Sequence, residues 1–131
     1  MGIKIGIHCE GCGWTEGYRL GLGSGMYSVK DTLALIPSEL RIRITELIQA
    51  HPEHTEDFEY RLYRCPLCGH LFERMHVAMM FGQNRYWESG YTCPDCASPL
   101  EMVTDPEEIP SLACPICGKR HLAVEDCIFW D

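Results

Sequence analysis

The chain has 131 residues and a formal charge of −8, so it can form one compact domain or two small modules that share a core. It has no apolar run near the roughly 18–20 residues of a membrane span, and its N-terminus lacks the apolar stretch of a signal peptide. These features predict a cytoplasmic protein without a membrane partner. The negative charge also disfavours binding to phosphate backbones, except through a local basic patch.

Two strands are predicted at the N-terminus, one on each side of the first cysteine pair. Ile3, Ile5 and Ile7 alternate with polar or small residues, and the same alternation recurs from Tyr18 to Leu22. Between the two strands lies CEGCG, in which Gly13 permits the backbone of a tight turn. The glycine-rich segment GLGSGMYS that follows predicts a bend.

The next part of the chain predicts helix. Ser28 followed by Asp31 resembles a capping box, and VKDTLALI is long enough for two helical turns before Pro37 interrupts. From Pro37 to about Ala50, apolar residues recur at helical spacing. This apolar face consists of Leu40, Ile44, Leu47 and Ile48.

The remainder predicts β-structure. Alternation over residues 58–63 indicates a strand that leads into Cys65, and LFERMHVAMMF indicates a long strand that GQNR turns into YWESGYT. A short strand is expected at Leu100–Val103, and a last strand from about Leu122 to Trp130. The acidic segment DPEEIPS between these two is expected to be a loop.

Eight of the nine cysteines form four Cys-x-x-Cys pairs. Each pair puts two thiolates on one tight turn, here called a knuckle, and two knuckles supply the four sulfur ligands of a tetrahedral metal site. In a reducing cytosol such pairs hold metal more often than they form disulfides. The predicted ligands of two structural zinc ions are Cys9, Cys12, Cys65, Cys68, Cys93, Cys96, Cys114 and Cys117. Rubredoxin-type iron uses the same geometry and stays an alternative.

The spacing favours a nested arrangement of the four knuckles. The residues between Cys68 and Cys93 read as one β-hairpin, the usual content of a zinc ribbon, so these two knuckles are expected to share an ion. The first and last knuckles then share the other ion and join the chain ends. The rival arrangement pairs the third knuckle with the fourth, across a gap that is also feasible.

Other residues near the knuckles have less specific roles. His8, His70 and His121 flank knuckles, so each is either a hydrogen-bond partner of the ligands or an exposed polar residue. Cys127 lies among apolar residues and is expected to be a buried small hydrophobe rather than a further ligand.

The cysteine sites do not predict an enzyme. Four thiolates leave no open coordination position for water, which catalytic zinc requires. The sequence also has no HExxH motif, no phosphate-binding loop and no zinc-deaminase motif. A thioredoxin-like redox pair would lie at the start of a helix, and none of the four pairs is expected there.

The order of motifs carries a resemblance. CxxCG is followed by a segment similar to LGxGM (Leu22, Gly23, Gly25 and Met26), a short helix, YRLYRCPLCG, a further CPxC, CPICG and a terminal Phe-Trp-Asp. This order resembles a group of small uncharacterised bacterial zinc-ribbon proteins over most of the chain. The resemblance implies metal binding and no known activity. Ala97 departs from it, because the family-like knuckle has glycine there.

Together these features predict an α+β, mainly β fold: two zinc ribbons with rubredoxin-like knuckles and one short helical insertion. Within a single compact domain spanning residues 1–131, residues 1–27 and 104–131 are expected to form a terminal ribbon. Residues 28–55 form the helical insertion, and residues 56–103 form a central ribbon.

The predicted function is that of a zinc-binding structural or adaptor protein that binds another protein or itself. Trp14, Trp87 and the pair Phe129–Trp130 are candidate anchors, although packing around the metal sites explains each of them equally well. The alternative is a nucleic-acid-binding zinc ribbon that uses basic and aromatic residues of the central hairpin. These are Arg61, Arg64, Arg74, His76 and Arg85, interleaved with Tyr63, Tyr86 and Trp87.

Overall fold

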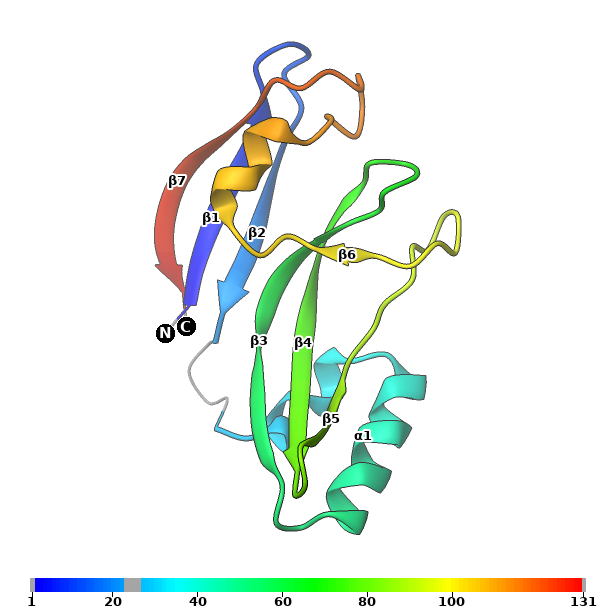
Figure 1. The fold of residues 1–131 in the computed structure, drawn as a ribbon. Helices are drawn as coiled ribbons and strands as arrows, with labels where there is room; N and C mark the ends of the chain where they lie inside the picture. Colours follow the sequence, from blue (N-terminus) through cyan, green and yellow to red (C-terminus); the bar gives the residue numbers. More distant parts are fainter. Residues whose placement is uncertain (1, 23–26, 131) are drawn as a thin grey trace.

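The computed structural model describes residues 2–22 and 27–130, without the side chains of residues 126, 127, 129 and 130. It confirms the predicted fold class: a mainly antiparallel β-sheet with short helices and two clusters of four cysteines, similar to a zinc ribbon (Figure 1). Within the described residues, no helix has the length and apolar character needed to cross a membrane. Residues 23–26 of the predicted glycine-rich bend lie outside the described residues.

The described residues form seven strands of one sheet. They are β1 (Gly2–Cys9), β2 (Thr15–Gly21), β3 (Thr55–Arg64), β4 (Leu71–Phe81), β5 (Arg85–Glu88), β6 (Glu101–Met102) and β7 (Leu122–Trp130). The sheet order is β5-β4-β3-β2-β1-β7, and β6 also pairs with β3. The predicted strands are present, but β5 is shorter than expected because the chain leaves the sheet after Glu88.

The two ribbons share one topology. In the terminal ribbon, a knuckle joins the antiparallel strands β1 and β2, and β7, which follows the fourth knuckle, pairs with β1. In the central ribbon, a knuckle joins β3 and β4, and β6, which follows the third knuckle, pairs with β3. The central ribbon is thus inserted between the second and third strands of the terminal ribbon (Figure 1).

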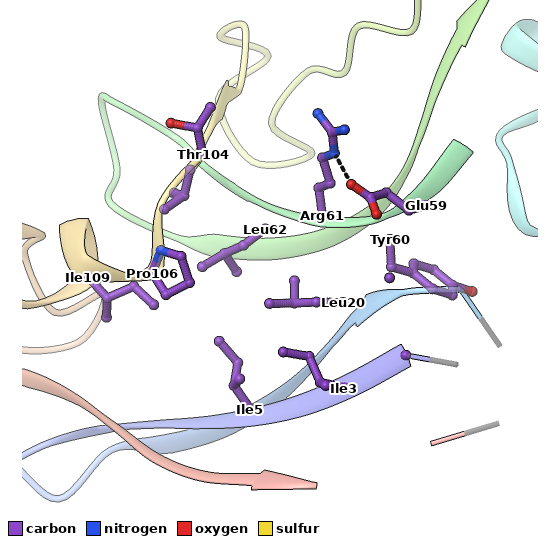
Figure 2. A pocket seen from close by; sticks show the side chains of 13 residues that line it. Ile3, Ile5, Leu20, Glu59, Tyr60, Arg61, Leu62, Thr104, Pro106 and Ile109 are labelled. Atoms are coloured by element: carbon purple, nitrogen blue, oxygen red, sulfur yellow. Dashed lines mark hydrogen bonds and ion pairs between the residues drawn. The ribbon is translucent and has the colours of Figure 1, made fainter. Parts of the chain in front are cut away.

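Strands β2 and β3 are joined over a very short length. In the described residues their register consists of one pair, Gly21 opposite Tyr60. The two strands then part, and a cavity lies between them (Figure 2). An ion pair holds the ribbons together beyond this point: the Glu73 carboxylate of β4 accepts hydrogen bonds from the backbone N–H of Arg19 at 3.0 Å and from its Nε at 3.1 Å. The Arg19 guanidinium also lies 4.5 Å from the centre of the Tyr60 ring.

Two helices follow β2, and the first differs from its prediction. The segment Val29–Leu35 forms a 3-10 helix, η1, and Ser38–Ala50 forms the α-helix α1. The predicted capping box of Ser28 and Asp31 is present, and in it the Asp31 carboxylate accepts the N–H of Ser28 at 2.9 Å. Pro37 ends η1, because a residue that precedes proline is driven to extended backbone. Ile36 accordingly has φ −115° and ψ 141°.

Helices η1 and α1 cover one face of the central ribbon. Their buried residues pack on apolar residues that alternate along β3 and β4. This helix-side core includes Val29, Ile36, Ile44, Leu47, Phe58, Tyr60, Met75, Val77 and Met79. The predicted apolar face of α1 is confirmed: Ile44 and Leu47 are buried, and Leu40 and Ile48 pack against them.

The acidic segment before the fourth knuckle is not the predicted loop. Pro106–Ser111 forms a short 3-10 helix, η2. The sequence does contain its start signals, since Asp105 accepts the N–H of Glu107 at 2.9 Å and Pro106 occupies the first helical position. Ile109 is fully buried, and this burial holds η2 against the terminal ribbon.

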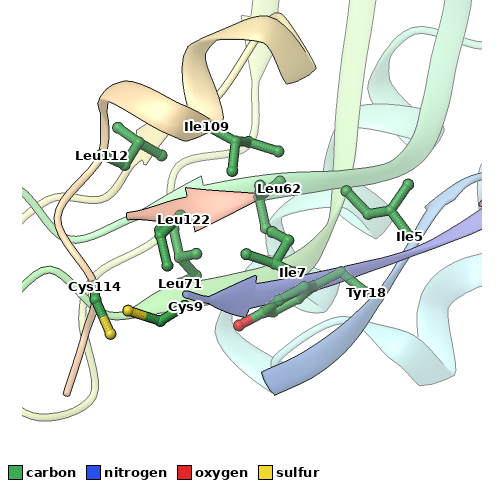
Figure 3. Packing of buried hydrophobic residues seen from close by; sticks show 10 residues of the cluster. All are labelled: Ile5, Ile7, Cys9, Tyr18, Leu62, Leu71, Ile109, Leu112, Cys114 and Leu122. Carbon is green, nitrogen blue, oxygen red and sulfur yellow. The ribbon is translucent and has the colours of Figure 1, made fainter. Parts of the chain in front are cut away.

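A second core lies under η2, in the terminal ribbon (Figure 3). Figure 3 shows Ile109 of η2 and Leu112, the residue after η2, above Ile7 of β1 and Leu62 of β3. The buried residues of this terminal core are Ile5, Ile7, Cys9, Tyr18, Leu62, Leu71, Ile109, Leu112, Cys114 and Leu122. Leu62 and Leu71 belong to the central ribbon, so this core also fastens the two ribbons together.

Candidate metal centres

The four knuckles have the same backbone structure. In each, the N–H of the first cysteine donates to the carbonyl oxygen five residues further along, at 2.7–2.9 Å. The N–H four residues further along donates back to the carbonyl oxygen of that cysteine, at 2.8–2.9 Å. These paired bonds close each turn and hold its two cysteine side chains close together.

The residue after the second cysteine takes a left-handed backbone conformation in every knuckle. Its φ is +81° at Gly13, +78° at Gly69 and +74° at Gly118. Glycine adopts such angles without steric cost. In the third knuckle Ala97 occupies this position with a φ of +60°, so the turn forms at a cost in backbone strain. The departure seen in the sequence is therefore a strained position in the structure.

Replacing Ala97 with glycine is expected to stabilise the metal-loaded protein by about 0.5–1 kcal/mol, since it relieves this strain. The matched control is Gly69→Ala. Nothing lies within 4 Å of a Cβ built there, so this control adds backbone strain alone. We expect it to destabilise by about 1 kcal/mol. Denaturant unfolding measures the stability of both variants. A loss of stability in Ala97→Gly would contradict the assignment of backbone strain to Ala97.

Among the described residues, the eight knuckle cysteines form two clusters of four. Within each cluster, the four sulfur atoms lie within 4.8 Å of one another. The terminal site consists of Cys9, Cys12, Cys114 and Cys117. The central site consists of Cys65, Cys68, Cys93 and Cys96. This is the nested arrangement favoured by the sequence, and the rival pairing of the third knuckle with the fourth is not what the structure has.

The sulfur separations fit a tetrahedral metal ion. The Sγ–Sγ distances between knuckles are 3.7 Å for Cys9–Cys117, 3.7 Å for Cys12–Cys114, 3.3 Å for Cys65–Cys96 and 3.6 Å for Cys68–Cys93. A regular tetrahedron with zinc–sulfur bonds of about 2.3 Å has edges of about 3.8 Å. A disulfide bond of about 2.05 Å is far shorter. Each cluster can therefore hold a metal ion.

Backbone N–H groups point at the first sulfur of a knuckle. The N–H of Cys68 lies 3.5 Å from the Sγ of Cys65, and the N–H of Ile116 lies 3.4 Å from the Sγ of Cys114. A donor directed at sulfur favours the thiolate over the thiol. The N–H of Cys68 accordingly lowers the pKa of the Cys65 thiol to about 6, and the N–H of Cys12 lowers the pKa of Cys9 to about 7.

In the first two knuckles, the second thiol has a raised pKa. The N–H of Trp14 lowers the pKa of Cys12, but burial and the neighbouring thiols raise it more, to about 11. The N–H of His70 likewise lowers the pKa of Cys68, which burial and its neighbours raise to about 12. Thiolates this close repel one another, so the ionisation of all four requires a cation among them.

One histidine links two knuckles of the central site. His70 Nδ1 lies 2.9 Å from a carboxylate oxygen of Asp95, which belongs to the third knuckle. This contact was missed from the sequence, because it depends on which knuckles come together. The other flanking histidines have different contacts: His8 lies 2.8 Å from Glu125, and the carbonyl oxygen of His121 accepts the N–H of Glu10.

The candidate aromatic anchors are mostly packed. Trp14 is half-buried against the terminal core, and Trp87 packs against the helix-side core. Packing therefore accounts for both, at least in part. The side chains of Phe129, Trp130 and Cys127 lie outside the described residues, so the predictions made for them stay predictions.

Carboxylates accompany several basic residues of the central hairpin. Arg61 pairs with Glu59 at 2.8 Å and with Asp57 at 3.6 Å. In the same way Arg64 lies 3.4 Å from Glu101, and the buried His76 lies 2.9 Å from Glu88. These pairs reduce the positive charge that the hairpin offers to a phosphate backbone.

Two apolar residues at knuckle tips were missed from the sequence. Leu67 in CPLC and Ile116 in CPIC are 76% and 68% exposed. Between the two sites lies a groove of about 360 Å³, with Trp14, Phe72 and Ile116 among the residues that line it. No pattern in the sequence indicates this surface, because the position between the cysteines of a knuckle tolerates many residue types.

The fold and the two clusters define a zinc-ribbon-like protein with two sites of four cysteines each. Comparisons with protein-family models, with curated proteins and with solved structures found no match. The resemblance to small bacterial zinc-ribbon proteins therefore stays a prediction.

Proposed function

We propose that this chain is a cytoplasmic structural protein in which two zinc ions support a surface that binds another protein. The observation that carries the proposal is the closed set of four cysteines at each site. With four sulfur ligands, a bound ion keeps no position for water or substrate, so its role is to hold the fold. An enzymatic function is not part of the proposal.

Zinc is the ion that this donor set favours. Four cysteines are the standard ligands of structural zinc, and the cytoplasm keeps thiols reduced and able to bind it. We expect two zinc ions per chain by elemental analysis of the purified protein. Fewer than about one and a half, or iron in place of zinc, would contradict the proposal.

The exposed surface beside the metal sites supports a protein partner. Leu67 and Ile116 project from knuckles of different sites, and exposed apolar groups of this kind are common in protein interfaces. The groove that Ile116 lines also contains Trp14 and Phe72, which are the residue types enriched at interface hot spots. The adaptor function therefore depends on this surface, and the metal ions hold its parts in place.

The variants Leu67→Ser and Ile116→Ser test the surface. Ile42→Ser is the matched control, because Ile42 is 61% exposed but lies on α1. We expect a stoichiometric partner, or a second copy of the chain, to accompany the tagged protein and to be lost in both test variants. The control keeps it. Equal loss in the control, or no stoichiometric partner at all, would contradict the proposal.

Nucleic-acid binding is the second candidate. The observation in its favour is Tyr86, which is 70% exposed beside the exposed Arg85 where β5 begins. An aromatic ring beside a cation suits a single strand. Binding to single-stranded DNA that weakens steeply with salt would favour this function, and no binding at low salt would exclude it.

A further inference from the structure

The side chain of His54 bridges the end of α1 and the start of β3. His54 directly precedes β3, and its side chain is only 10% exposed. Its Nδ1 lies 2.6 Å from the carbonyl oxygen of His51, the residue that caps the C-terminal end of α1. Its Nε2 lies 2.7 Å from a carboxylate oxygen of Glu56 in β3. The imidazole ring is therefore held from both sides.

The second carboxylate oxygen of Glu56 extends this bridge to η1. It accepts the backbone N–H of Val29, the first residue of η1, at 2.9 Å. Val29 is fully buried in the helix-side core, and the side chain of Glu56 is 22% exposed. The pair of His54 and Glu56 thus joins three elements, α1, β3 and η1.

The geometry favours a charged form of this pair. Both ring nitrogens of His54 contact hydrogen-bond acceptors, and a neutral imidazole has only one N–H to donate. An imidazolium has two N–H groups, so it satisfies both contacts, and an ionised carboxylate accepts with both of its oxygens. A neutral ring would instead need a proton from Glu56, and glutamate is normally ionised at the pH where imidazole titrates.

The groups around the ring act in the same direction. Glu56 faces it from β3, Glu53 lies in the loop before β3, and the His51 carbonyl faces it from the end of α1. The hydrogen bond to Glu56 raises the pKa of His54 above its ordinary value of 6.5. Burial opposes this rise, and the His51 carbonyl and the two carboxylates add to it. The His51 ring lies 3.6 Å from Glu53.

We propose that His54 and Glu56 form a pH-sensitive clamp that holds η1 and the end of α1 on the central ribbon and opens as the pH rises. When His54 loses its proton, one ring nitrogen presents a lone pair to an acceptor. Either the contact with His51 or the contact with Glu56 is then lost. Loss of the contact with Glu56 also frees the carboxylate that holds Val29 at the start of η1.

The direction of the pH dependence distinguishes the clamp from the metal sites. The stabilisation by the clamp is fully present below the pKa of histidine in the unfolded chain, about 6.5, and is lost as the pH rises through the higher pKa of the folded state. Metal binding needs deprotonated thiols, so it weakens as the pH falls. This inference does not depend on the identity of the metal or on the proposed protein partner.

The test follows the full metal-loaded chain from about pH 6 to pH 9. NMR titration of the ring protons should give His54 a pKa above the ordinary value, and Glu56→Gln should lower this pKa because it removes the charge and keeps the shape. Hydrogen exchange, corrected for its intrinsic pH dependence, should show about a tenfold loss of protection at the Val29 amide across the His54 titration. The amides of β1 should keep their protection.

Two histidine variants separate the clamp from other titrating groups. His54→Gln should make the protection of the Val29 amide independent of pH. His51→Gln is the matched control, because it removes a neighbouring ring and keeps the carbonyl oxygen that His54 contacts. This control should retain the pH dependence. A pH dependence that persists in His54→Gln would overturn the proposal, and where that variant fails to fold, an unchanged His54 pKa in Glu56→Gln would do so.

Discussion

Replacing Cys68 with serine is expected to remove the metal from the central site and to unfold the central ribbon without any chelator. Cys68 belongs to the second knuckle, and its Sγ lies 3.6 Å from that of Cys93 in the third. Structural zinc contributes on the order of 10 kcal/mol to the folding of small zinc domains. This is as large as the whole free energy of unfolding of a typical domain, roughly 5–15 kcal/mol. The central ribbon therefore cannot lose the stabilisation from its metal ion and stay folded.

Metal analysis and circular dichroism measure this outcome. The metal content should fall from two ions per chain to at most one, with a loss of β-sheet signal. The matched control is Leu67→Ser, which introduces serine into the same knuckle at an exposed position that is not a ligand. This control should keep both ions and its thermal midpoint. A soluble Cys68→Ser protein with an unchanged midpoint would refute the structural role of the central site.

Replacing Cys114 with serine is expected to have a different effect, confined to the terminal ribbon. The terminal site joins knuckles far apart in sequence, since Cys12 and Cys114 are 102 positions apart. A cross-link that closes a loop of this length lowers the conformational entropy of the unfolded chain. For a disulfide, this stabilises the folded state by about 4–5 kcal/mol. Loss of the metal from the terminal site should release β7 and η2 from β1. The central site does not include Cys114, so it should keep its metal.

Hydrogen exchange resolves the two regions. Segments from β1 and β7 should lose protection in Cys114→Ser, while α1 and the part of β4 beneath it keep theirs. Ile116→Ser, in the same knuckle, is the control and should exchange like the unaltered protein. Uniform loss of protection along the chain would show that the two ribbons unfold as one unit. It would contradict the expectation that the central ribbon stays folded when the terminal ribbon opens.

The sequence was sufficient for the features that depend on local pattern. Alternation predicted β1, β2 and β3, and helical spacing predicted α1, because apolar residues on one face of each of these elements pack into a core. The eight cysteines were evident from their spacing. The nested pairing was favoured because the residues between Cys68 and Cys93 had to form a hairpin, and β4 and β5 do form one.

Features that depend on contacts between distant residues could not be predicted. The pair Arg19–Glu73 joins residues 54 positions apart, and nothing in either neighbourhood identifies the partner. The separation of β2 from β3 likewise follows from how the two ribbons pack, and so does the cavity between them. The helix η2 was different, since Asp105 and Pro106 carried a local signal that the acidic composition obscured.

The nested topology has a consequence for the order in which the protein is made. The central ribbon and its four cysteines are complete once the ribosome has synthesised β6. The terminal ribbon, by contrast, has only β1 and β2 until its third strand, β7, has been synthesised. During translation the central site can therefore take its metal first, because domains fold as their residues emerge. Until Cys114 and Cys117 appear, Cys9 and Cys12 remain an incomplete pair on the nascent chain. The first cysteines to be synthesised are thus among the last to find their partners.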